Sequence, residues 1–446
     1  MPKPQVKTRA WMTAAAGAIA LVGCQFGIRY SVGGTVTGLT GHGLVLEDNA
    51  GGDLSVASNG AFAFTKGVQN GDPYSVTVRT QPSNPSQTCT VHNGSGTIDK
   101  ADVANIIVSC SQSGHFAYVA NQLSNDVSAY SIDSTSGFLT PISGSPFSAI
   151  GTAPVALAAD PNGRFLYAVN NGSNDVEIYA IDGSTGALTS AGLPKSTGSG
   201  PVAVAIDPTD SFLYVANLAS NSVSAYAIDS ATGLLTEMST SPFTVGAQPS
   251  SLKVDPSGNF LYVTNFGDGN VDVLAIDSTG SLSRISGSPF GAGAGALSIV
   301  IDPAGTFAYV ANETAASISE FSINTSTGAL ALVSGSPLAT GTSPESLAVD
   351  SAGRFLYVAN VTAKNKVGTF SITPSSGALT PSGTPIAAGT FPICVVLDPS
   401  GSFAYVANDN SNDISVYTVD AATGVLTPVS HSPFGAGNEP RSIAID

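Results

Sequence analysis

The chain is poor in the residues that most often carry binding or catalytic chemistry. Only 10% of its 446 residues are charged, four are histidine, four are cysteine and one is tryptophan. Acidic residues outnumber basic ones by 31 to 15, for a formal net charge of -16. Because nucleic acids are polyanions, an acidic chain without a basic cluster after residue 30 repels them. We therefore expect no nucleic-acid partner and, beyond Trp11, no tryptophan platform for sugars.

Familiar catalytic and cofactor motifs are missing as well. The sequence has no G-x-S-x-G nucleophile turn, no H-E-x-x-H zinc motif, no C-x-x-C-H haem motif and no glycine-rich phosphate loop. Asp-rich turns such as 124–127 and 267–270 do not contain the full ligand set of a calcium loop. No apolar period of 3.6 residues runs through the chain, which excludes a stack of helix pairs. We expect no metal and no cofactor.

The N-terminal segment has the pattern of an export signal. Basic residues precede the apolar run 11–23, which is shorter than the roughly 20 apolar residues that a membrane-spanning helix needs. The run ends in Leu21-Val22-Gly23-Cys24, which resembles the bacterial lipobox, whose cysteine is lipidated after cleavage. The resemblance implies a signal peptide at 1–23, lipidation at Cys24 and a tether at 24–30. An ordinary signal with an incidental cysteine is the alternative.

Lipidation would also set the location of the protein. An exported chain that carries several acyl groups is held durably at a membrane. In Gram-negative lipoproteins, the absence of Asp after the lipidated cysteine favours the outer membrane, and here the next residue is Gln25. The expected location is therefore the cell envelope, with the membrane as a partner through the lipid anchor.

Residues 31–112 differ in pattern from the remainder of the chain. Short alternating segments are separated there by Gly, Asn and Asp, which predicts a small antiparallel β-sandwich. The layout resembles immunoglobulin-like or prealbumin-like modules of surface proteins. Cys89 and Cys110 lie in this module and could pair in an oxidising compartment. Cys394 lies elsewhere, at a position where other repeats have Ala or Ser, and we expect it to be a small buried residue rather than a reactive thiol.

From residue 114 onward, one apolar hexapeptide recurs seven times as FAYVAN, FLYAVN, FLYVAN or FLYVTN, at intervals of 47–49 residues. Its tyrosines are Tyr118, Tyr167, Tyr214, Tyr262, Tyr309, Tyr357 and Tyr405. A typical unit has a first strand such as 345–350, a type I turn that is usually Asp-Pro, the hexapeptide as second strand, a third strand, and a Gly-containing hairpin to a fourth strand. Four short strands in about 48 residues indicate a β-propeller blade.

The period of two within the hexapeptide places Phe and Tyr on one face, where we expect them to form the core between blades. The Asn that ends each copy is interpreted as a turn residue. The first repeat lacks a first strand, whereas the segment PRSIAID at 440–446 matches one. We therefore predict that residues 440–446 complete the first blade. The expected fold is all-β, a seven-bladed β-propeller at 113–446 preceded by the small β-sandwich.

The repeats and their D-P-x-G turns resemble the YVTN-repeat propellers and the bacterial seven-bladed lactonase family, which includes 6-phosphogluconolactonases and muconate-type lactone cyclases. The resemblance covers about residues 113–446 and implies the propeller fold and, as an activity, lactone hydrolysis. That family typically uses His, Arg and Glu around the channel. The two histidines of the repeats, His115 and His431, lie outside the segments expected to line it. No catalytic residue is therefore transferred from the family.

Ligands of propellers usually bind at the mouth of the central channel, which the first strands line. The position after the first-strand Pro holds, around the ring, Arg441, Val155, Val202, Ser250, Leu297, Glu345 and Ile393. For lactone hydrolysis, Glu345 is the candidate general base and Arg441 the candidate oxyanion donor, but the favoured interpretation of the two residues is a plain ion pair or solvated rim charges. Lys253 and Glu439, the other charged residues of these segments, are candidates for ligand binding.

Two functions from different classes remain open. The favoured one is a lipid-anchored envelope protein that binds a glycan, a small molecule or a protein at the channel mouth, or acts as a scaffold. The alternative is a lactone-ring hydrolase. Charged groups that converge in one mouth with perturbed pKa values would favour the hydrolase, whereas an apolar or serine-lined mouth would favour the binding protein.

Overall fold

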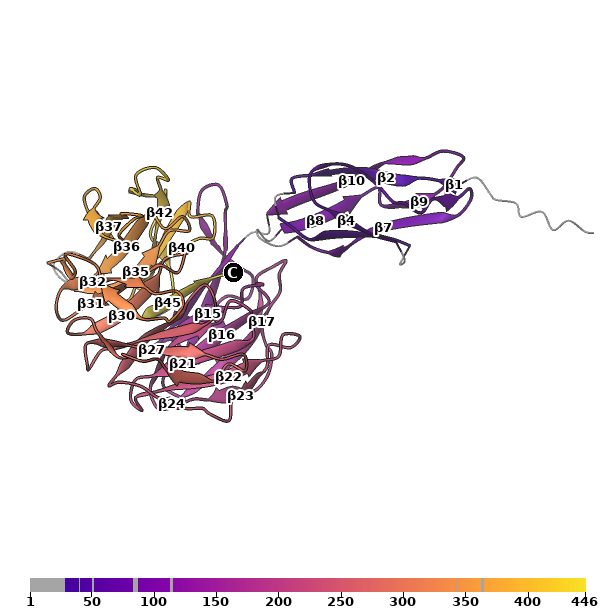
Figure 1. Cartoon of the computed structure of the whole chain (residues 1–446). Coiled ribbons are helices and arrows are strands. Elements are labelled where there is room, and N and C mark those ends of the chain that lie inside the picture. The colour runs from indigo at the N-terminus through magenta and orange to yellow at the C-terminus, as the bar shows by residue number, and fades with distance from the viewer. Residues whose placement is uncertain are drawn as a thin grey trace, which may run out of the picture. The chain divides into compact units, whose positions relative to one another are not determined.

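The computed structural model describes residues 29–39, 41–49, 52–82, 87–112, 115–341, 343–361 and 365–446. The expected signal peptide at 1–23, Cys24 and the tether up to residue 28 lie outside these ranges. The chain divides into two compact units, Met1–Gln112 and Ser113–Asp446 (Figure 1). Their described residues form strands, turns and loops, so the fold is all-β.

Among these residues, no helix has the length and apolar character that crossing a membrane would require.

The first unit contains two four-stranded sheets. One sheet has the order β5 (Gly60–Ala63), β2 (Val32–Thr37), β10 (Val103–Gln112) and β8 (Gln87–His92). The other has the order β4 (Gly52–Val56), β3 (Leu44–Asp48), β7 (Pro73–Thr80) and β9 (Ser95–Thr97), and β1 (Arg29–Tyr30) pairs with β6 (Val68–Gln69). Alternate residues of both sheets, including Val36, Leu46 and Ile106, are fully buried in one core. This unit is the predicted β-sandwich.

Two features complete the sandwich. Cys89 and Cys110 face each other on β8 and β10 and form the expected disulfide. The prediction of a purely antiparallel sandwich is wrong for one pair, because β10 runs parallel to β2. Parallel neighbours need a long connection, and here the whole intervening module provides it.

The second unit consists of seven sheets that share one strand order. The first strands are β15 (Pro154–Ala159), β20 (Pro201–Ile206), β25 (Pro249–Val254), β30 (Ala296–Ile301), β35 (Pro344–Val349), β40 (Pro392–Leu397) and β45 (Pro440–Ile445). The second strands are the hexapeptides: β11 (Phe116–Asn121), β16 (Phe165–Asn170), β21 (Phe212–Asn217), β26 (Phe260–Asn265), β31 (Phe307–Asn312), β36 (Phe355–Asn360) and β41 (Phe403–Asn408).

The outer strands follow in the same way. The third strands are β12 (Asp126–Ile132), β17 (Asp175–Ile181), β22 (Ser222–Ile228), β27 (Asn270–Ile276), β32 (Ser317–Ile323), β37 (Lys366–Ile372) and β42 (Asp413–Val419). The fourth strands are β13 (Leu139–Pro141), β18 (Leu188–Ser190), β23 (Leu235–Glu237), β28 (Leu282–Arg284), β33 (Leu330–Leu332), β38 (Leu379–Pro381) and β43 (Leu426–Pro428).

Each sheet also has a short fifth strand that pairs with the third strand, which the four-stranded prediction did not include. These strands are β14 (Phe147–Ser148), β19 (Lys195–Ser196), β24 (Phe243–Thr244), β29 (Phe290–Gly291), β34 (Leu338–Ala339), β39 (Ile386–Ala387) and β44 (Phe434–Gly435).

The first blade is assembled from both ends of the second unit. Strand β45 pairs antiparallel with β11 and adjoins both β15 and β40, the first strands of the neighbouring blades. The Asp446 carboxylate accepts a hydrogen bond from the Phe116 backbone N–H at 2.7 Å. In the second blade, Asp160 accepts the corresponding bond from Phe165 at 2.8 Å. Asp446 therefore does in the first blade what the turn aspartate does in the others.

The packing between blades explains why the hexapeptide is repeated. Gly186 of the second blade has a φ of +72°, and a Cβ there would collide with the ring of Phe116 in the first blade. The Tyr118 hydroxyl, fully buried, donates to the Gly186 carbonyl at 3.1 Å. The same tyrosine-to-glycine bond is made by Tyr167, Tyr214, Tyr262, Tyr309 and Tyr405. A Phe–Gly contact thus joins each blade to the next, and at six of the seven interfaces the Tyr–Gly hydrogen bond accompanies it.

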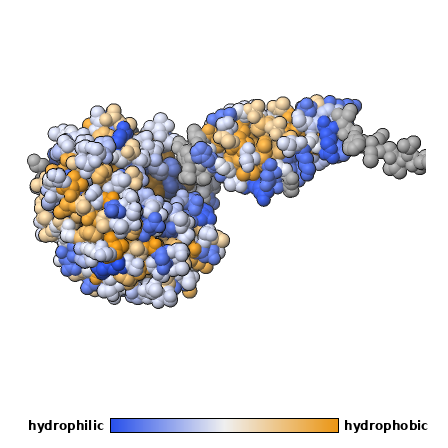
Figure 2. All heavy atoms as spheres, viewed as in Figure 1, coloured by the Kyte–Doolittle hydropathy of each residue, from blue (hydrophilic) through white to orange (hydrophobic). Residues whose placement is uncertain are grey.

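The Asn at the end of the hexapeptide has a role beyond forming a turn. The Asn121 side chain is fully buried, and its amide donates to Asp126 at 2.7 Å and to Ser128 at 2.9 Å. It thereby fixes the end of the second strand to the start of the third. On the face of the unit that Figure 2 shows, deep blue is limited to scattered patches among pale and orange residues, in keeping with a chain of which 10% is charged.

Candidate functional site

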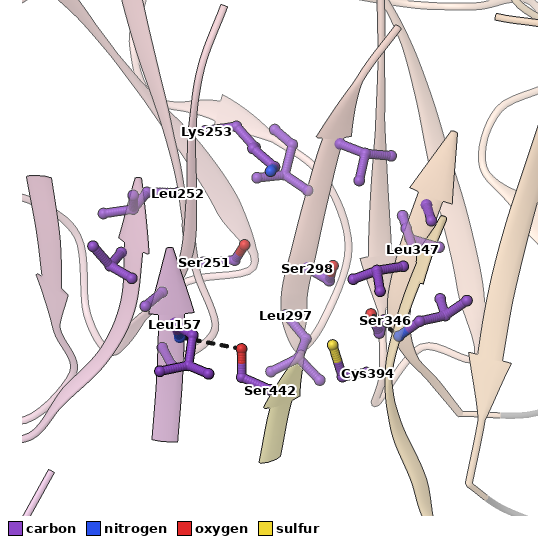
Figure 3. Close-up of a pocket in the computed structure, with 18 of the residues that line it drawn as sticks. Leu157, Ser251, Leu252, Lys253, Leu297, Ser298, Ser346, Leu347, Cys394 and Ser442 are labelled. Atoms are coloured by element: carbon purple, nitrogen blue, oxygen red, sulfur yellow. Dashed lines mark hydrogen bonds between the residues drawn. The ribbon is translucent and has the colours of Figure 1, made fainter. Parts of the chain in front are cut away.

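The first strands of all seven blades enclose a pocket of about 870 Å³ (Figure 3). Every residue that the sequence placed after the first-strand Pro lines it, namely Val155, Val202, Ser250, Leu297, Glu345, Ile393 and Arg441. The Ser250 hydroxyl is used within the fold, because it donates to the backbone carbonyl of Leu297 at 2.9 Å. This layer is the channel mouth, and Glu345 and Arg441 are its charged members.

Glu345 projects from β35 and makes no hydrogen bond or ion pair with the described residues. The pKa of its carboxyl is raised from 4.5 to about 7, first by burial and second by the nearby negative charge of Glu313, while the positive charge of Arg441 opposes both effects. A carboxylate with a pKa near neutral pH is suited to accept a proton from water and to return it. Its lack of a partner leaves both oxygens available for that task.

Arg441 projects from β45 and is held by a carboxylate that the sequence analysis did not consider. Its Nη1 lies 3.2 Å from Oδ2 of Asp409. The simple ion pair between Arg441 and Glu345, offered as the alternative to a catalytic pair, is therefore wrong: the arginine is paired with Asp409. A guanidinium has five N–H donors, so this contact leaves several for a ligand.

Sequence reasoning missed Glu313 and Asp409, which both follow the Asn of a hexapeptide directly. The residues at this position are Gln122, Asn171, Leu218, Phe266, Glu313, Val361 and Asp409. Three of the other five, Gln122, Asn171 and Leu218, line the pocket itself. The signal was in the repeat itself, because seven different residues follow an Asn that never changes. Such variation indicates that the packing of the blades does not restrict this position, so its side chains are available to the site.

The two candidates for ligand binding lie in different places. Lys253 lines the pocket on β25, three residues further along its strand than the mouth layer. Glu439 is not among the lining residues. It precedes Pro440 with a φ of +54°, and its backbone N–H donates to Asn412 at 2.9 Å. Its backbone carbonyl accepts a hydrogen bond from the N–H of Gln122, which does line the pocket, and a binding role for Glu439 stays a prediction.

Below the mouth lies a layer of small residues. The Ser442 hydroxyl accepts a hydrogen bond from the Leu157 N–H of the next blade at 3.2 Å, and the Ser346 hydroxyl accepts one from Val395 at 3.1 Å. Cys394 occupies the same position in β40 and accepts from the Ile443 N–H, while burial raises the pKa of its thiol. Cys394 is thus a small, protonated lining residue.

The two histidines of the repeats are used elsewhere. His115 Nδ1 lies 2.6 Å from the backbone oxygen of Asp446 at the closure of the first blade. The ring of His431 contacts that of Phe138 edge-on. Neither lines the pocket, in agreement with the expectation from the sequence.

The family comparison covers the propeller. A family model described as "Lactonase, 7-bladed beta-propeller" matches residues 108–250 and 244–442. No curated protein matches the chain.

Solved structures share the fold. A putative 6-phosphogluconolactonase from Bacteroides uniformis is 21% identical with a TM-score of 0.67, over 75% of this chain and 100% of that one. A putative 6-phosphogluconolactonase from Bacteroides fragilis is 20% identical with a TM-score of 0.67, over 75% and 98%. A periplasmic gluconolactonase from Pseudomonas aeruginosa is 21% identical with a TM-score of 0.63, over 74% and 98%. At 20–21% identity, these three structures show a shared fold only. The family model, in contrast, matches the sequence over most of the chain. The chain therefore belongs to the seven-bladed β-propeller lactonase family.

Proposed function

We propose that this protein hydrolyses a lactone at the channel mouth, with Glu345 as general base and Arg441 as the donor to the oxyanion. The observation that carries the proposal is the unpartnered Glu345 carboxyl, whose pKa burial and Glu313 raise to about 7 beside a fixed guanidinium. Membership of the lactonase family supports the same reaction class. Both observations favour the hydrolase over the binding or scaffold protein that the sequence analysis preferred.

The chemistry follows from the two side chains. Glu345 takes a proton from a water molecule as the water oxygen attacks the lactone carbonyl carbon. The negative charge that develops on the carbonyl oxygen is stabilised by the free N–H groups of Arg441. The ring C–O bond then breaks, and the departing alkoxide oxygen takes the proton from Glu345. The product is a hydroxy acid, which ionises in water, and Glu345 is again a carboxylate.

The test is a panel of aliphatic, sugar and phosphorylated sugar lactones, assayed at about pH 8 with the wild type and Glu345→Gln. We expect Glu345→Gln to lose about 100-fold or more in kcat/KM for any lactone that the wild type opens, as is typical when a general base is removed. Glu237→Gln, at an exposed position on β23, is the matched control and should keep full activity. Equal rates for the wild type and Glu345→Gln would refute the assignment, as would a wild type that opens no lactone.

Export and lipid anchoring stay predictions from the N-terminal sequence. A chain anchored through Cys24 would act on lactones in the cell envelope. Metabolic labelling with a radioactive fatty acid tests this. The wild type should take up the label and Cys24→Ser should not, and equal labelling of the two would contradict lipidation at this residue.

A further inference from the structure

Lys253 is out of place among its counterparts in the channel. It lies on the first strand of its blade at the fourth position after the Pro, and the other blades have small apolar residues there: Ala158, Ala205, Val300, Ala348, Val396 and Ala444. All seven first strands run in the same sense around the channel, so these positions form one layer. Because Ala or Val fills this position in six blades, packing alone does not explain a lysine in the seventh.

The ammonium group of Lys253 has no partner among the described residues. It is open to the space inside the channel, but protein surrounds it, and this loss of hydration lowers its pKa. The Cys394 thiol cannot balance the charge, since burial raises its pKa and keeps it neutral. A cation that is partly removed from water without a counter-ion is costly. A bound anion would remove that cost.

Two carboxylates, Asp302 and Asp398, also line this pocket, at the ends of their first strands, and both already accept hydrogen bonds from the backbone. Asp302 accepts hydrogen bonds from the backbone N–H groups of Thr306 and Phe307, both at 2.6 Å. Asp398 accepts one from Phe403 at 2.7 Å. These are the turn aspartates of their blades, and no ion pair joins either of them to Lys253.

Two hydroxyl groups accompany the ammonium. Ser251 and Ser298 lie in the layer of small residues, and unlike Ser346 and Ser442 their side chains make no hydrogen bond with the described residues. Figure 3 shows their hydroxyls, together with the sulfur of Cys394, pointing toward the level of the channel at which Lys253 lies. One charged donor and two free hydroxyl donors thus face the same space, which is the donor set that an oxyanion needs.

The surroundings of these donors restrict the anion. Among the described residues that line the pocket, no second cation lies at this level, so a single negative charge is matched better than the double charge of a phosphate. The rest of the layer is Ala and Val, which favours an aliphatic body over a polyol, because hydroxyl groups buried there would lose their hydrogen bonds to water. Three residues of strand separate Lys253 from the Glu345 layer, about 10 Å along the channel.

We propose that the channel interior binds a short aliphatic monocarboxylate, held by the Lys253 ammonium and the hydroxyls of Ser251 and Ser298. The site is distinct from the mouth. It extends the proposed function, because opening a simple aliphatic lactone would yield such a carboxylate next to it. The binding itself does not depend on that reaction.

The experiment is calorimetric titration of the full chain with pentanoate. The ligands for comparison are pentanamide, which lacks the charge, gluconate, which replaces the aliphatic body by a polyol, and inorganic phosphate, which carries more charge. The variants are Lys253→Met, Ser251→Ala with Ser298→Ala, and the control Lys195→Met at an exposed position on β19. Glu345→Gln is titrated too, so that the result is independent of whether hydrolysis is found.

We expect the wild type, Glu345→Gln and Lys195→Met to bind pentanoate alike, and Lys253→Met to bind it about tenfold or more weakly, which corresponds to about 1.4 kcal/mol. The affinity of the double serine variant for pentanoate should lie between those of the wild type and Lys253→Met. Pentanamide, gluconate and phosphate should bind to the wild type more weakly than pentanoate does. A melting temperature for Lys253→Met at or above that of the wild type verifies that it folds, because the variant loses a charge that is costly to the fold. Absence of pentanoate binding at about 10 mM, where even a weak site would be detected, equal binding by Lys253→Met, or tighter binding of gluconate or phosphate would each overturn the proposal.

Discussion

Two sets of positions within each blade behave in opposite ways. The Tyr and Phe of the second strand and the Gly of the outer hairpin are the same in all seven blades, and they meet the neighbouring blade. The residues after the first-strand Pro vary between blades, with only Val155 and Val202 alike, those after the hexapeptide Asn are all different, and many of both sets line the channel. The constant positions therefore account for the fold, whereas the variable ones hold the candidate site.

The reason for this contrast is geometric. Each core cluster of the propeller combines residues of two adjacent blades, as where Val119 of the first blade packs with Tyr405 of the seventh. Every such interface has the same shape, so the same side chains fit all of them. All seven blades face one common space at the channel, and nothing there requires them to be alike. The predictions that follow test this division, beginning with the largest expected effect.

A substitution at a constant position should damage the fold most. Gly186→Ala places a methyl group against the ring of Phe116 at a residue with φ of +72°. Strain and overpacking each cost about 1–3 kcal/mol, so we expect the free energy of unfolding to fall by about 2–4 kcal/mol. Chemical denaturation would measure it.

Gly183→Ala is the matched control for this substitution. It lies in the same hairpin, but no atom lies within 4 Å of the position its Cβ would take. Its effect should stay within about 0.5 kcal/mol. Equal losses for Gly183→Ala and Gly186→Ala would show that the hairpin, and not the contact between blades, sets the cost.

A substitution at a variable position should leave the fold intact and, above neutral pH, even stabilise it. The pKa of Glu345 rises from 4.5 to about 7 in the folded protein, so between these values the folded state binds more protons than the unfolded chain. The free energy of unfolding of the wild type therefore falls as pH rises through this window.

Glu345→Gln lacks that slope. The difference in the free energy of unfolding between Glu345→Gln and the wild type should be about 1–2 kcal/mol more favourable to the variant at about pH 8 than at about pH 4. This is less than the full pKa shift implies, because water in the channel screens the charge. Denaturation at both pH values measures the difference. A variant that loses stability equally at both would place Glu345 among the residues that hold the fold.

The smallest effect concerns one hydroxyl group of the interface between blades. Tyr118→Phe removes the hydrogen bond to the Gly186 carbonyl and should cost about 1 kcal/mol. Tyr357 has the same place in its own blade, but its hydroxyl has no hydrogen-bond partner among the described residues. Tyr357→Phe should consequently be close to neutral. A comparable loss for both variants, seen by denaturation, would contradict the importance of this bond.

The sequence predicted the fold better than the site. The hexapeptides predicted the second strands with their exact bounds, and the Asp-Pro turns separated them from the first strands. Repetition made this possible, because seven copies of one pattern leave little freedom in how they pack. The contact of each Phe with a Gly of the next blade was not predicted, since the two residues are far apart in the chain, as Phe116 and Gly186 or Phe403 and Gly137 are.

At the channel, the sequence indicated which positions line the pocket but not how their side chains interact. Counting along the first strand found Glu345 and Arg441. It did not find Glu313 and Asp409, because they follow the second strand and reach the mouth only through the way the blade folds. The raised pKa of Glu345 could not be anticipated, since it depends on burial and on a neighbouring charge from another blade. Such effects exist only in the assembled ring.

The most direct test of the division between fold and site is the pKa of Glu345 itself, which requires no substrate. Carbon-13 NMR of glutamate carboxyl groups, assigned with Glu345→Gln, would follow its titration in the wild type and in Glu313→Gln. We predict a midpoint near pH 7 for Glu345 in the wild type and a lower one in Glu313→Gln. A midpoint near 4.5, unchanged by Glu313→Gln, would show that Glu345 is an ordinary surface carboxylate and would contradict a catalytic mouth.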